Sequence, residues 1–421
     1  MPVLGRIQSG AAALSVLTGL NVLNYADRYV GAAMLPLILV SLSLSDAAGG
    51  LLQSVFIITY SLASPLAGWL GDRRPRLPLA TVGVLVWSAA TVASGLAPTY
   101  ALLLIARAVI GVGEASYAVV TPSLVSDLYP PDQRGRALAI FYAAIPAGTA
   151  LGYALGGSVG VTLGWRAGFL IAGVPGALLG LTLLLLREPT RGAFDKADAG
   201  QATPLAFRPS LRALVARRSY LFNTAAQVIY TFAMGGLATW MPTYFVRERD
   251  IPLATAASTF GLLLLVAGFG GTLLGGHLGD RMARRLRGAQ FALSGWSLVG
   301  SLGFTVLAVL SPAPALFWPS MFVTLFLLFL NIGPLNAAMA NVLPADLRGR
   351  GFALTTMAIH LLGDAASPWL IGVISDRVGL TAPVLATGTL LAASGAVLLA
   401  GRTALERDLK AAGSQEEEST P

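Results

Sequence analysis

Apolar segments, each about as long as a membrane-spanning helix, recur along almost the whole chain. A helix needs about 20 predominantly apolar residues to cross the hydrocarbon core of a bilayer. Segments of about that length lie at residues 10–38, 47–71, 77–97, 99–126, 136–161, 165–186, 219–245, 254–279, 289–311, 314–342, 351–375 and 381–401. We therefore predict an all-α polytopic membrane protein with twelve transmembrane helices.

The composition supports a lipid-facing surface. Hydrophobic residues make up 55% of the 421 residues and charged residues only 11%, whereas soluble globular chains carry about 25% charged residues. The chain has no cysteine and two histidines, so disulfides, thiolate metal sites and histidine-built metal centres are not expected. We predict no metal and no cofactor, and a proton gradient as the energy source.

One long polar stretch divides the apolar segments into two sets of six. It lies between the sixth and seventh segments. We predict an N-terminal six-helix half at 1–187, a cytoplasmic linker at 188–218 and a C-terminal six-helix half at 219–402. The polar residues 403–421, which include Glu416, Glu417 and Glu418, predict a disordered cytoplasmic tail.

The basic residues predict the orientation in the membrane. If both termini are cytoplasmic, the cytoplasmic loops and ends hold 22 of the 28 lysines and arginines, and the outer loops hold only Arg166, Arg247, Arg249 and Arg377. Cytoplasmic loops of membrane proteins carry such an excess. The net charge of +8 therefore needs no nucleic-acid partner, and we predict an integral membrane protein with both termini in the cytoplasm.

Two motifs occur once in each half. The second apolar segment ends in G-W-L-G-D-R, with Asp72 and Arg73, and the eighth ends in G-H-L-G-D-R, with Asp280 and Arg281. The motif P-D-Q-R-G-R follows the fourth segment, and A-D-L-R-G-R follows the tenth. Their arginines are Arg134, Arg136, Arg348 and Arg350. The nearly constant offset predicts two pseudo-symmetric halves, and such repeats place a binding cavity at their interface.

The loop between the second and third segments, G-W-L-G-D-R-R-P-R, resembles the signature of the major facilitator superfamily. The resemblance covers essentially the whole chain. It implies that Asp72 pairs with arginines of neighbouring helices and locks the cytoplasmic gate in the outward-open state. The residues that it assigns to gating are Asp72, Arg73, Arg76, Asp280, Arg281, Arg134, Arg136, Arg348 and Arg350. The alternative is an ordinary basic turn with a capping aspartate.

Three further stretches resemble the Spinster branch of this superfamily. They are N-Y-A-D-R from Asn24, R-A-V-I-G-V-G-E-A-S-Y from Arg107 and I-F-Y-A-A-I-P-A-G-T-A-L-G-Y from Ile140. Eukaryotic members of this branch export sphingosine-1-phosphate or lysophospholipids. The resemblance implies a transporter, and the arginine-rich, lysine-poor chain indicates a bacterial member in the inner membrane.

Four charged residues fall inside predicted spans. Asp27 and Arg28 lie in the first, and Arg107 and Glu114 lie seven residues apart in the fourth. Charges inside a membrane are costly and usually functional, so we expect all four to face the interior of the bundle. Burial favours a neutral carboxyl and a nearby arginine favours the anion. This set can exchange a proton, or it can be a static ion-pair network.

The predicted site combines proton-coupling and substrate-binding residues. Asp27 is the first choice for proton coupling, because Asn24 one turn earlier can hydrogen-bond to it, and Glu114 is the second. The predicted substrate-binding residues are Arg28, Arg107, Asn24, Tyr60, Tyr117, Asn331, His360 and Asp364. His360 and Asp364 share one helix face. They form either a proton relay or a pair that positions the helix.

The predicted function is proton-coupled secondary active transport by alternating access. Arginines beside apolar surface suit an amphiphilic or lipid-like molecule, and the alternative is a proton-coupled multidrug or organic-anion exporter. An enzyme is not expected, because the chain has no cysteine nucleophile and no catalytic constellation. A receptor on the same scaffold remains an alternative. The expected partners are the bilayer and the small molecule, and the expected state is a monomer.

Overall fold

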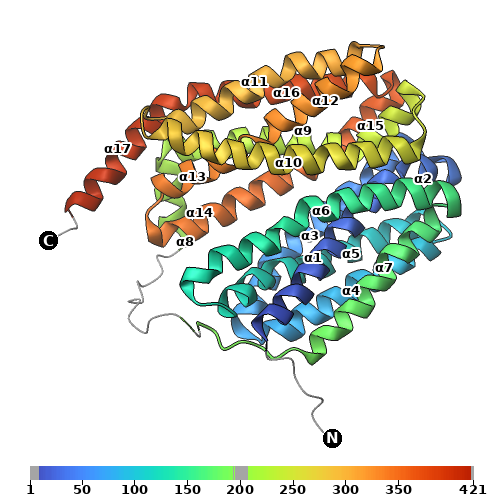
Figure 1. Cartoon of the computed structure of the whole chain (residues 1–421), viewed down its shortest axis with the longest axis horizontal. Helices are drawn as coiled ribbons and strands as arrows, with labels where there is room; N and C mark the ends of the chain where they lie inside the picture. The colour runs from blue at the N-terminus through green and yellow to red at the C-terminus, as the bar shows by residue number, and fades with distance from the viewer. Residues whose placement is uncertain (1–8, 193, 195–206, 419–421) are drawn as a thin grey trace, which may run out of the picture. The chain divides into compact units, whose positions relative to one another are not determined.

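The structure, a computed structural model, describes residues 9–192, 194 and 207–418 (Figure 1). The first six predicted spans are helical. Their helices are Gly10–Ala33 (α1) with Leu35–Ser41 (α2), Asp46–Arg73 (α3), Arg76–Leu96 (α4), Tyr100–Asp127 (α5), Pro131–Leu163 (α6), and Trp165–Leu181 (α7) with the 3₁₀ turn Thr182–Leu185. Pro36 lies directly after the break between α1 and α2. It accounts for the break, because proline lacks the amide hydrogen that would continue the helix.

The other six predicted spans are helical as well. Their helices are Arg218–Arg249 (α9), Leu253–Ala283 (α10), Ala289–Leu310 (α11), Pro314–Phe329 (α12) with Ile332–Val342 (α13), Ala345–Ala358 (α14) with Ser367–Val378 (α15), and Thr381–Ala400 (α16). A π-helical segment, Ile359–Asp364, joins α14 to α15. Two further helices lie outside the predicted spans, Phe207–Ala216 (α8) and Arg402–Glu418 (α17).

Ten helices of the described chain are long and apolar enough to cross a membrane. The two predicted spans that do not reach this apolarity are α1 and α9, which have 24 and 32 residues. In α1 the reason is polar content, since this helix carries Asn21, Asn24, Asp27 and Arg28. The least apolar span of the first half is thus the one that carries the predicted proton site.

The described residues pack as two compact units. Unit 1 consists of Met1–Ala199, Ala238–Leu265 and Pro368–Arg377, and unit 2 of Gly200–Leu237, Val266–Ser367 and Val378–Pro421. Helices α9 and α10 therefore each contribute one end to unit 1, and α15 lies in it except for its two terminal residues. We call the end of unit 1 that carries Arg73, Arg74 and Arg76 the basic end, and the opposite end the far end. The division of the sequence at 188–218 stays a prediction.

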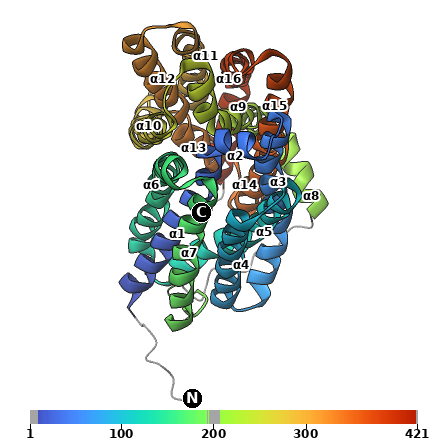
Figure 2. The ribbon, with the colours of Figure 1, turned by 90° about the vertical axis from the view of Figure 1, so that its right-hand side faces the viewer.

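Small residues let α6 lie against α1, and the two helices run side by side in both ribbon views (Figures 1 and 2). A Cβ atom on Gly148 would lie 2.4 Å from the carbonyl oxygen of Val22, and one on Gly152 would lie 2.4 Å from that of Ala26. Interhelical contact this close is typical of small-residue spacing in membranes. The seam fixes α1, and with it Asp27 and Arg28, inside unit 1.

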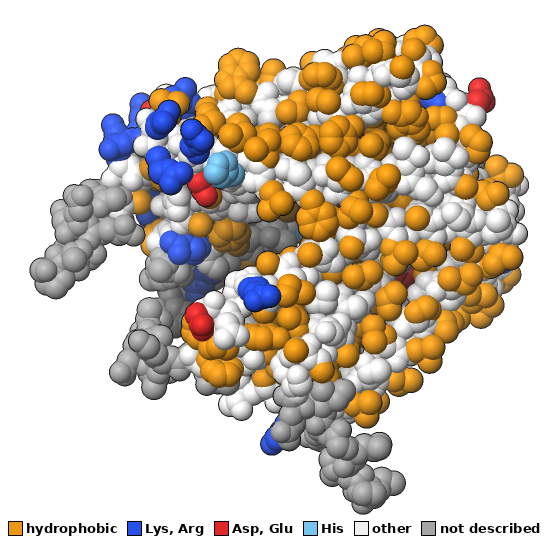
Figure 3. All heavy atoms as spheres, in the orientation of Figure 1, with side chains coloured by type: hydrophobic (Ala, Val, Ile, Leu, Met, Phe, Trp, Pro, Cys, Tyr) orange, Lys and Arg blue, Asp and Glu red, His pale blue; other side chains and the backbone are white. Residues whose placement is uncertain are grey.

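Large apolar side chains lie exposed on the helices, as expected for a surface that faces lipid (Figure 3). Leu62, Leu178, Leu273 and Trp296 are each more than half exposed. A soluble chain rarely exposes so much apolar area. The lateral surfaces therefore suit a bilayer, in agreement with the composition.

The prediction of a disordered tail is wrong for the described part of residues 403–421, because α17 occupies it. Leu405 is fully buried, and the Asp408 carboxylate accepts hydrogen bonds from the amide and hydroxyl of Ser219, at 3.0 and 2.5 Å. Arg402 and Glu406, one turn apart, form an ion pair. Burial and capping within unit 2 thus order a segment whose polar composition alone suggested disorder.

We predict that Gly152→Val destabilises the protein, because a Cβ there would overlap the backbone of α1. The thermal unfolding temperature in detergent should fall by several degrees, as expected when a change costs about 1–3 kcal/mol. Gly303→Ala is the control, since no atom lies within 4 Å of its Cβ position. Equal unfolding temperatures for the two variants would contradict the seam.

Candidate functional site

An ion pair joins α1 to α5 inside unit 1. Arg28 donates from Nη2 to Glu114 Oε2 at 2.7 Å and from Nε to the same oxygen at 3.2 Å. The Glu114 side chain is fully buried, and the Arg28 side chain is 14% exposed. Arg28 is therefore the most exposed of the four charged residues predicted inside the membrane.

Aromatic rings surround the Arg28 guanidinium. Its central carbon lies 4.9 Å from the ring centre of Tyr25, 5.1 Å from that of Phe56 and 5.0 Å from that of Tyr60. The faces of aromatic rings attract cations, most strongly where water is excluded. Tyr60, predicted to bind substrate, thus lies beside Arg28.

Asp27 is buried, at 1% exposure, and faces α4. Its Oδ2 accepts a 2.5 Å hydrogen bond from the Thr91 hydroxyl, while Oδ1 has no hydrogen-bond partner among the described residues. The predicted bond from Asn24 is wrong, since in the described chain Asn24 makes no hydrogen bond to Asp27 and lies beside Glu114. The reason is that Asp27 is directed towards α4, where Thr91 offers a donor.

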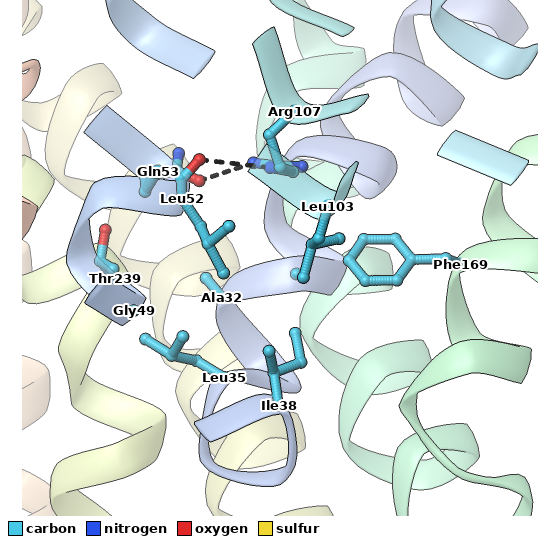
Figure 4. A pocket seen from close by; sticks show the side chains of 11 residues that line it. Ala32, Leu35, Ile38, Gly49, Leu52, Gln53, Leu103, Arg107, Phe169 and Thr239 are labelled. Atoms are coloured by element: carbon cyan, nitrogen blue, oxygen red, sulfur yellow. Dashed lines mark hydrogen bonds between the residues drawn. The ribbon is translucent and has the colours of Figure 1, made fainter. Parts of the chain in front are cut away.

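Arg107 is 2% exposed and lies beside Gln53 and Leu52 (Figure 4). Its Nη2 donates to Gln53 Oε1 at 2.8 Å, its Nε to the Leu52 carbonyl at 3.5 Å, and its guanidinium lies 5.0 Å from the Phe56 ring centre. In the part of the chain that the structure describes, its Nη1 has no hydrogen-bond partner. In this structure α1, α3 and α5 enclose its side chain, and the role of Arg107 in substrate binding stays a prediction.

The four charges thus form a compact cluster of two acids and two bases. Asp27 interacts electrostatically with both Glu114 and Arg107. All four residues face the interior, as the sequence predicted. Among the described residues, buried Asp27 Oδ1, Glu114 Oε1 and Arg107 Nη1 lack hydrogen-bond partners. Buried polar atoms are nearly always paired, and the described residues alone do not saturate this cluster.

Two other predicted binding residues are parts of the packed core. Tyr117 is fully buried, donates to the Leu17 carbonyl at 2.5 Å and packs edge-on against Trp87. Asn331 is 2% exposed and donates to the Leu328 carbonyl, where α12 gives way to α13. Neither side chain is presented to a ligand in this structure, because Tyr117 binds a backbone carbonyl of α1 and Asn331 binds one in the preceding turn.

The predicted pair on the eleventh span, in unit 2, is formed. His360 Nδ1 lies 3.1 Å from both carboxylate oxygens of Asp364, and both side chains are partly exposed. They lie in the π-helical segment, in which Ala365 donates to the carbonyl of His360. π-Helical turns are rare and frequent at functional sites. The relay and the positioning role both remain compatible with this geometry.

The basic end of unit 1 contains a charge cluster centred on Arg76, not on Asp72. Arg76 Nη1 lies 2.6 Å from Asp127 Oδ2, and Arg76 Nε lies 3.6 Å from Glu188. The Glu188 carboxylate also accepts from the amides of Arg76 and Leu77, at 2.7 and 3.2 Å. Asp72 is exposed, and its carboxylate joins no ion pair of the described chain. The gating role of Asp72 stays a prediction.

Arg191 lies at the same end of unit 1 and binds the end of α3. It donates to the carbonyls of Gly71, Asp72 and Arg74, at 2.5, 2.5 and 2.6 Å, and so caps the end of α3. The last carbonyls of a helix have no partner within it. Sequence reasoning missed Arg191, although the charged residues of E-P-T-R directly after the sixth span were a usable signal.

The repeated R-G-R motifs make equivalent contacts in the two units. Arg134 donates to the carbonyl of Tyr129 at 3.2 Å, and Arg348 to that of Leu343 at 3.4 Å, in each case five residues earlier. The second arginines of the two motifs differ in their surroundings. Arg136 is exposed, whereas Arg350 contacts Ser210 of α8. Asp280 and Arg281 are exposed as well. The shared contact supports the internal repeat that the sequence predicted.

Another ionic cluster lies at the far end of unit 1. The Asp46 carboxylate accepts from Arg247 Nη1 at 2.7 and 2.9 Å and from the Ser375 hydroxyl at 2.6 Å. The Asp376 carboxylate accepts from the amides of Asp46 and Ala47, at 2.7 and 3.0 Å, and caps α3. These bonds join the ends of α3, α9 and α15. No pattern in the sequence indicated these bonds, because their partners lie far apart in the chain.

We predict that Glu114→Leu lowers the free energy of unfolding by about 3 kcal/mol, because it leaves Arg28 without its ion-pair partner. The double variant Arg28→Met/Glu114→Leu should recover most of this loss. Denaturant titration in detergent micelles measures both values. A double variant no more stable than Glu114→Leu would contradict the pairing.

We also predict that Asp46→Asn loosens the far end, because the Arg247 ion pair is lost. Ser41 and Glu248 are both exposed and can each be replaced by cysteine for spin labelling. The labelling is specific because the chain has no cysteine of its own. In Asp46→Asn the distribution of distances between the two labels should become broader, and its mean distance longer. Arg402→Gln, which removes an exposed ion pair elsewhere, is the control. Identical distributions for both variants would contradict a role of the Asp46–Arg247 ion pair in holding the far end together.

Comparison with known proteins assigns the fold and the site to a class. The model of the Major Facilitator Superfamily matches residues 17–368. Protein spinster homolog 1 of Homo sapiens is 35% identical, over 87% of this chain and 73% of the relative. The sphingosine-1-phosphate transporter SPNS2 of Xenopus tropicalis is 33% identical, over 88% and 75%.

Among solved structures, a bacterial homologue of the human lysosomal transporter Spinster, inward-facing and unoccupied, matches with a TM-score of 0.87 at 23% identity, over 95% of this chain and 98% of that one. These matches define an integral membrane transporter with the major facilitator fold, and not an enzyme. The chain belongs to the Major Facilitator Superfamily and, within it, to the Spinster family.

Proposed function

We propose that the protein is a proton-coupled secondary transporter that moves an amphiphilic, lipid-like small molecule by alternating access. The observation that carries this proposal is Asp27, a buried carboxylate beside Arg107 with one oxygen unpartnered in the described chain. Burial favours the protonated carboxyl and the arginine favours the anion. Because these effects oppose each other, a small rearrangement of the cluster suffices to load or release a proton.

The environment of Arg28 supports an amphiphile with an anionic head. A guanidinium binds phosphate or carboxylate oxygens through paired hydrogen bonds, and the rings of Tyr25, Phe56 and Tyr60 offer apolar surface beside it. The relative named as a sphingosine-1-phosphate transporter suggests a molecule of this kind. An anionic head that binds Arg28 competes with Glu114, and this competition links substrate to the charge cluster.

The proposed placement follows the basic residues. With the basic end in the cytoplasm, Arg73, Arg74 and Arg76 lie on the side that positively charged loops prefer, and the Asp46 cluster lies outside. We propose a bacterial inner membrane, where a proton gradient is present, and a monomer as the transporting unit. One proton that moves down a potential of 100 mV supplies about 2.3 kcal/mol.

We predict that Asp27→Asn abolishes gradient-driven transport, because the amide keeps the shape of the carboxyl and cannot ionise. In proteoliposomes, uptake of labelled sphingosine-1-phosphate driven by a pH gradient should fall at least tenfold, to the level without a gradient. Exchange of the same lipid across the membrane at equal pH should persist.

Thr91→Val is the matched control, since it removes the hydrogen bond to Asp27 and leaves the carboxylate in place. This variant should keep gradient-driven uptake. Full gradient-driven transport by Asp27→Asn would refute the proton site. A wild-type protein that ignores sphingosine-1-phosphate and moves drug-like or small organic anions instead would refute the lipid-like substrate and leave the proton site intact.

A further inference from the structure

A small cavity lies in unit 1 beside Arg107 (Figure 4). Apolar side chains form most of its wall, namely Leu35, Ile38, Leu52, Leu103 and Phe169. Its volume is about 20 Å³, and a cavity needs about 10–15 Å³ by this measure to hold one water molecule. The cavity therefore has room for about one water molecule and for no larger ligand.

The charged group at this cavity is the Arg107 guanidinium, and the polar side chains of Gln53 and Thr239 line the cavity as well. Two of its nitrogens bind Gln53 and the Leu52 carbonyl, and Nη1 has no hydrogen-bond partner among residues that the structure describes. Gly31 also lines the cavity, and a Cβ atom on Gly31 would lie 3.6 Å from Nη1. A water molecule here would accept a hydrogen bond from a buried donor that otherwise has none, which is how ordered interior waters are held.

The cavity and the proposed proton site share helix α1 and the side chain of Arg107. Asp27 and Gly31 are four residues apart in α1 and therefore share one face of the helix. Asp27 interacts electrostatically with Arg107, and its Oδ1 lacks a partner within the described chain. Gly49 and Leu52 place the other side of the cavity near the start of α3, the end that carries Asp46. The cavity thus lies between the far end and Asp27.

We propose that this cavity is a hydrated chamber that passes protons from the far end to Asp27 through a water molecule held by Arg107. The inference rests on the proposed proton coupling and adds the route. In the transfer, one O–H bond of a protonated water breaks as one O–H bond forms on the Asp27 carboxylate, and neutral water remains. The positive charge of Arg107 keeps the excess proton from resting in the chamber.

Gly31→Ala tests the chamber, because its methyl group would lie 3.5 Å from the Phe169 ring and 3.6 Å from Arg107 Nη1. These are ordinary contacts, so the methyl group fits and occupies the space of the water. Gly303→Ala is the matched control, with nothing within 4 Å of its Cβ position. The readout is the carboxyl C=O infrared band that Asp27→Asn lacks, followed in proteoliposomes after the far side is acidified.

The band should rise at least tenfold more slowly in Gly31→Ala than in the wild-type protein, and at the wild-type rate in Gly303→Ala. Equal rates in Gly31→Ala and the wild-type protein would overturn the route and leave the coupling role of Asp27 intact. Absence of the band from the wild-type protein at every pH would instead refute the proton site. If Gly31→Ala does not fold, Leu103→Ala serves as the second variant, because it widens the chamber. Asp27 should then become protonated at least as fast as in the wild-type protein. Slower protonation of Asp27 would overturn the proposal.

A crystal structure gives an independent check on the occupant of the chamber. Electron density for water within hydrogen-bonding distance of Arg107 Nη1 would support the route. An anomalous bromide peak there after a bromide soak would identify a halide site and overturn it.

Discussion

Two acids and two arginines lie inside a bundle whose outer surface suits lipid, and each must find its partner within the protein. A charge at the bilayer centre costs about 3 kcal/mol or more. Arg28 and Glu114 meet this constraint by pairing at 2.7 Å. Arg107 meets it with neutral partners, Gln53 and a backbone carbonyl. Asp27 is left with the single hydroxyl of Thr91, and the proposed proton coupling rests on this uneven distribution of partners.

The helices that hold these residues are fixed at both ends of unit 1 by polar contacts at helix termini. At the basic end, Glu188 binds the first amides of α4 and Arg191 binds the last carbonyls of α3. At the far end, Asp376 caps α3 and Asp46 binds Arg247. Helix termini carry unsatisfied backbone groups, so short charged segments can tie several helices together. Such contacts can also break and reform, as alternating access requires.

The site could be predicted in part from the sequence. The cost of charge in lipid was sufficient to place Asp27, Arg28, Arg107 and Glu114 in the interior. It could not pair them, because helix neighbours and side-chain directions arise from packing between segments far apart in the chain. For this reason Asn24 was wrongly assigned to Asp27, Tyr117 proved to be a core residue, and the partners of Arg107 were not foreseen.

The sequence by itself determined the class of the protein, its helical spans and its internal repeat. Apolar length and repeated motifs are local properties, and a bilayer leaves few other ways to satisfy the backbone. The tertiary structure decided which polar groups meet. It ordered α17 through the burial of Leu405, enclosed Arg107 between α1, α3 and α5, and left a cavity beside Gly31. Contacts of this kind depend on ångström-scale distances between helices, which no local pattern in the chain specifies.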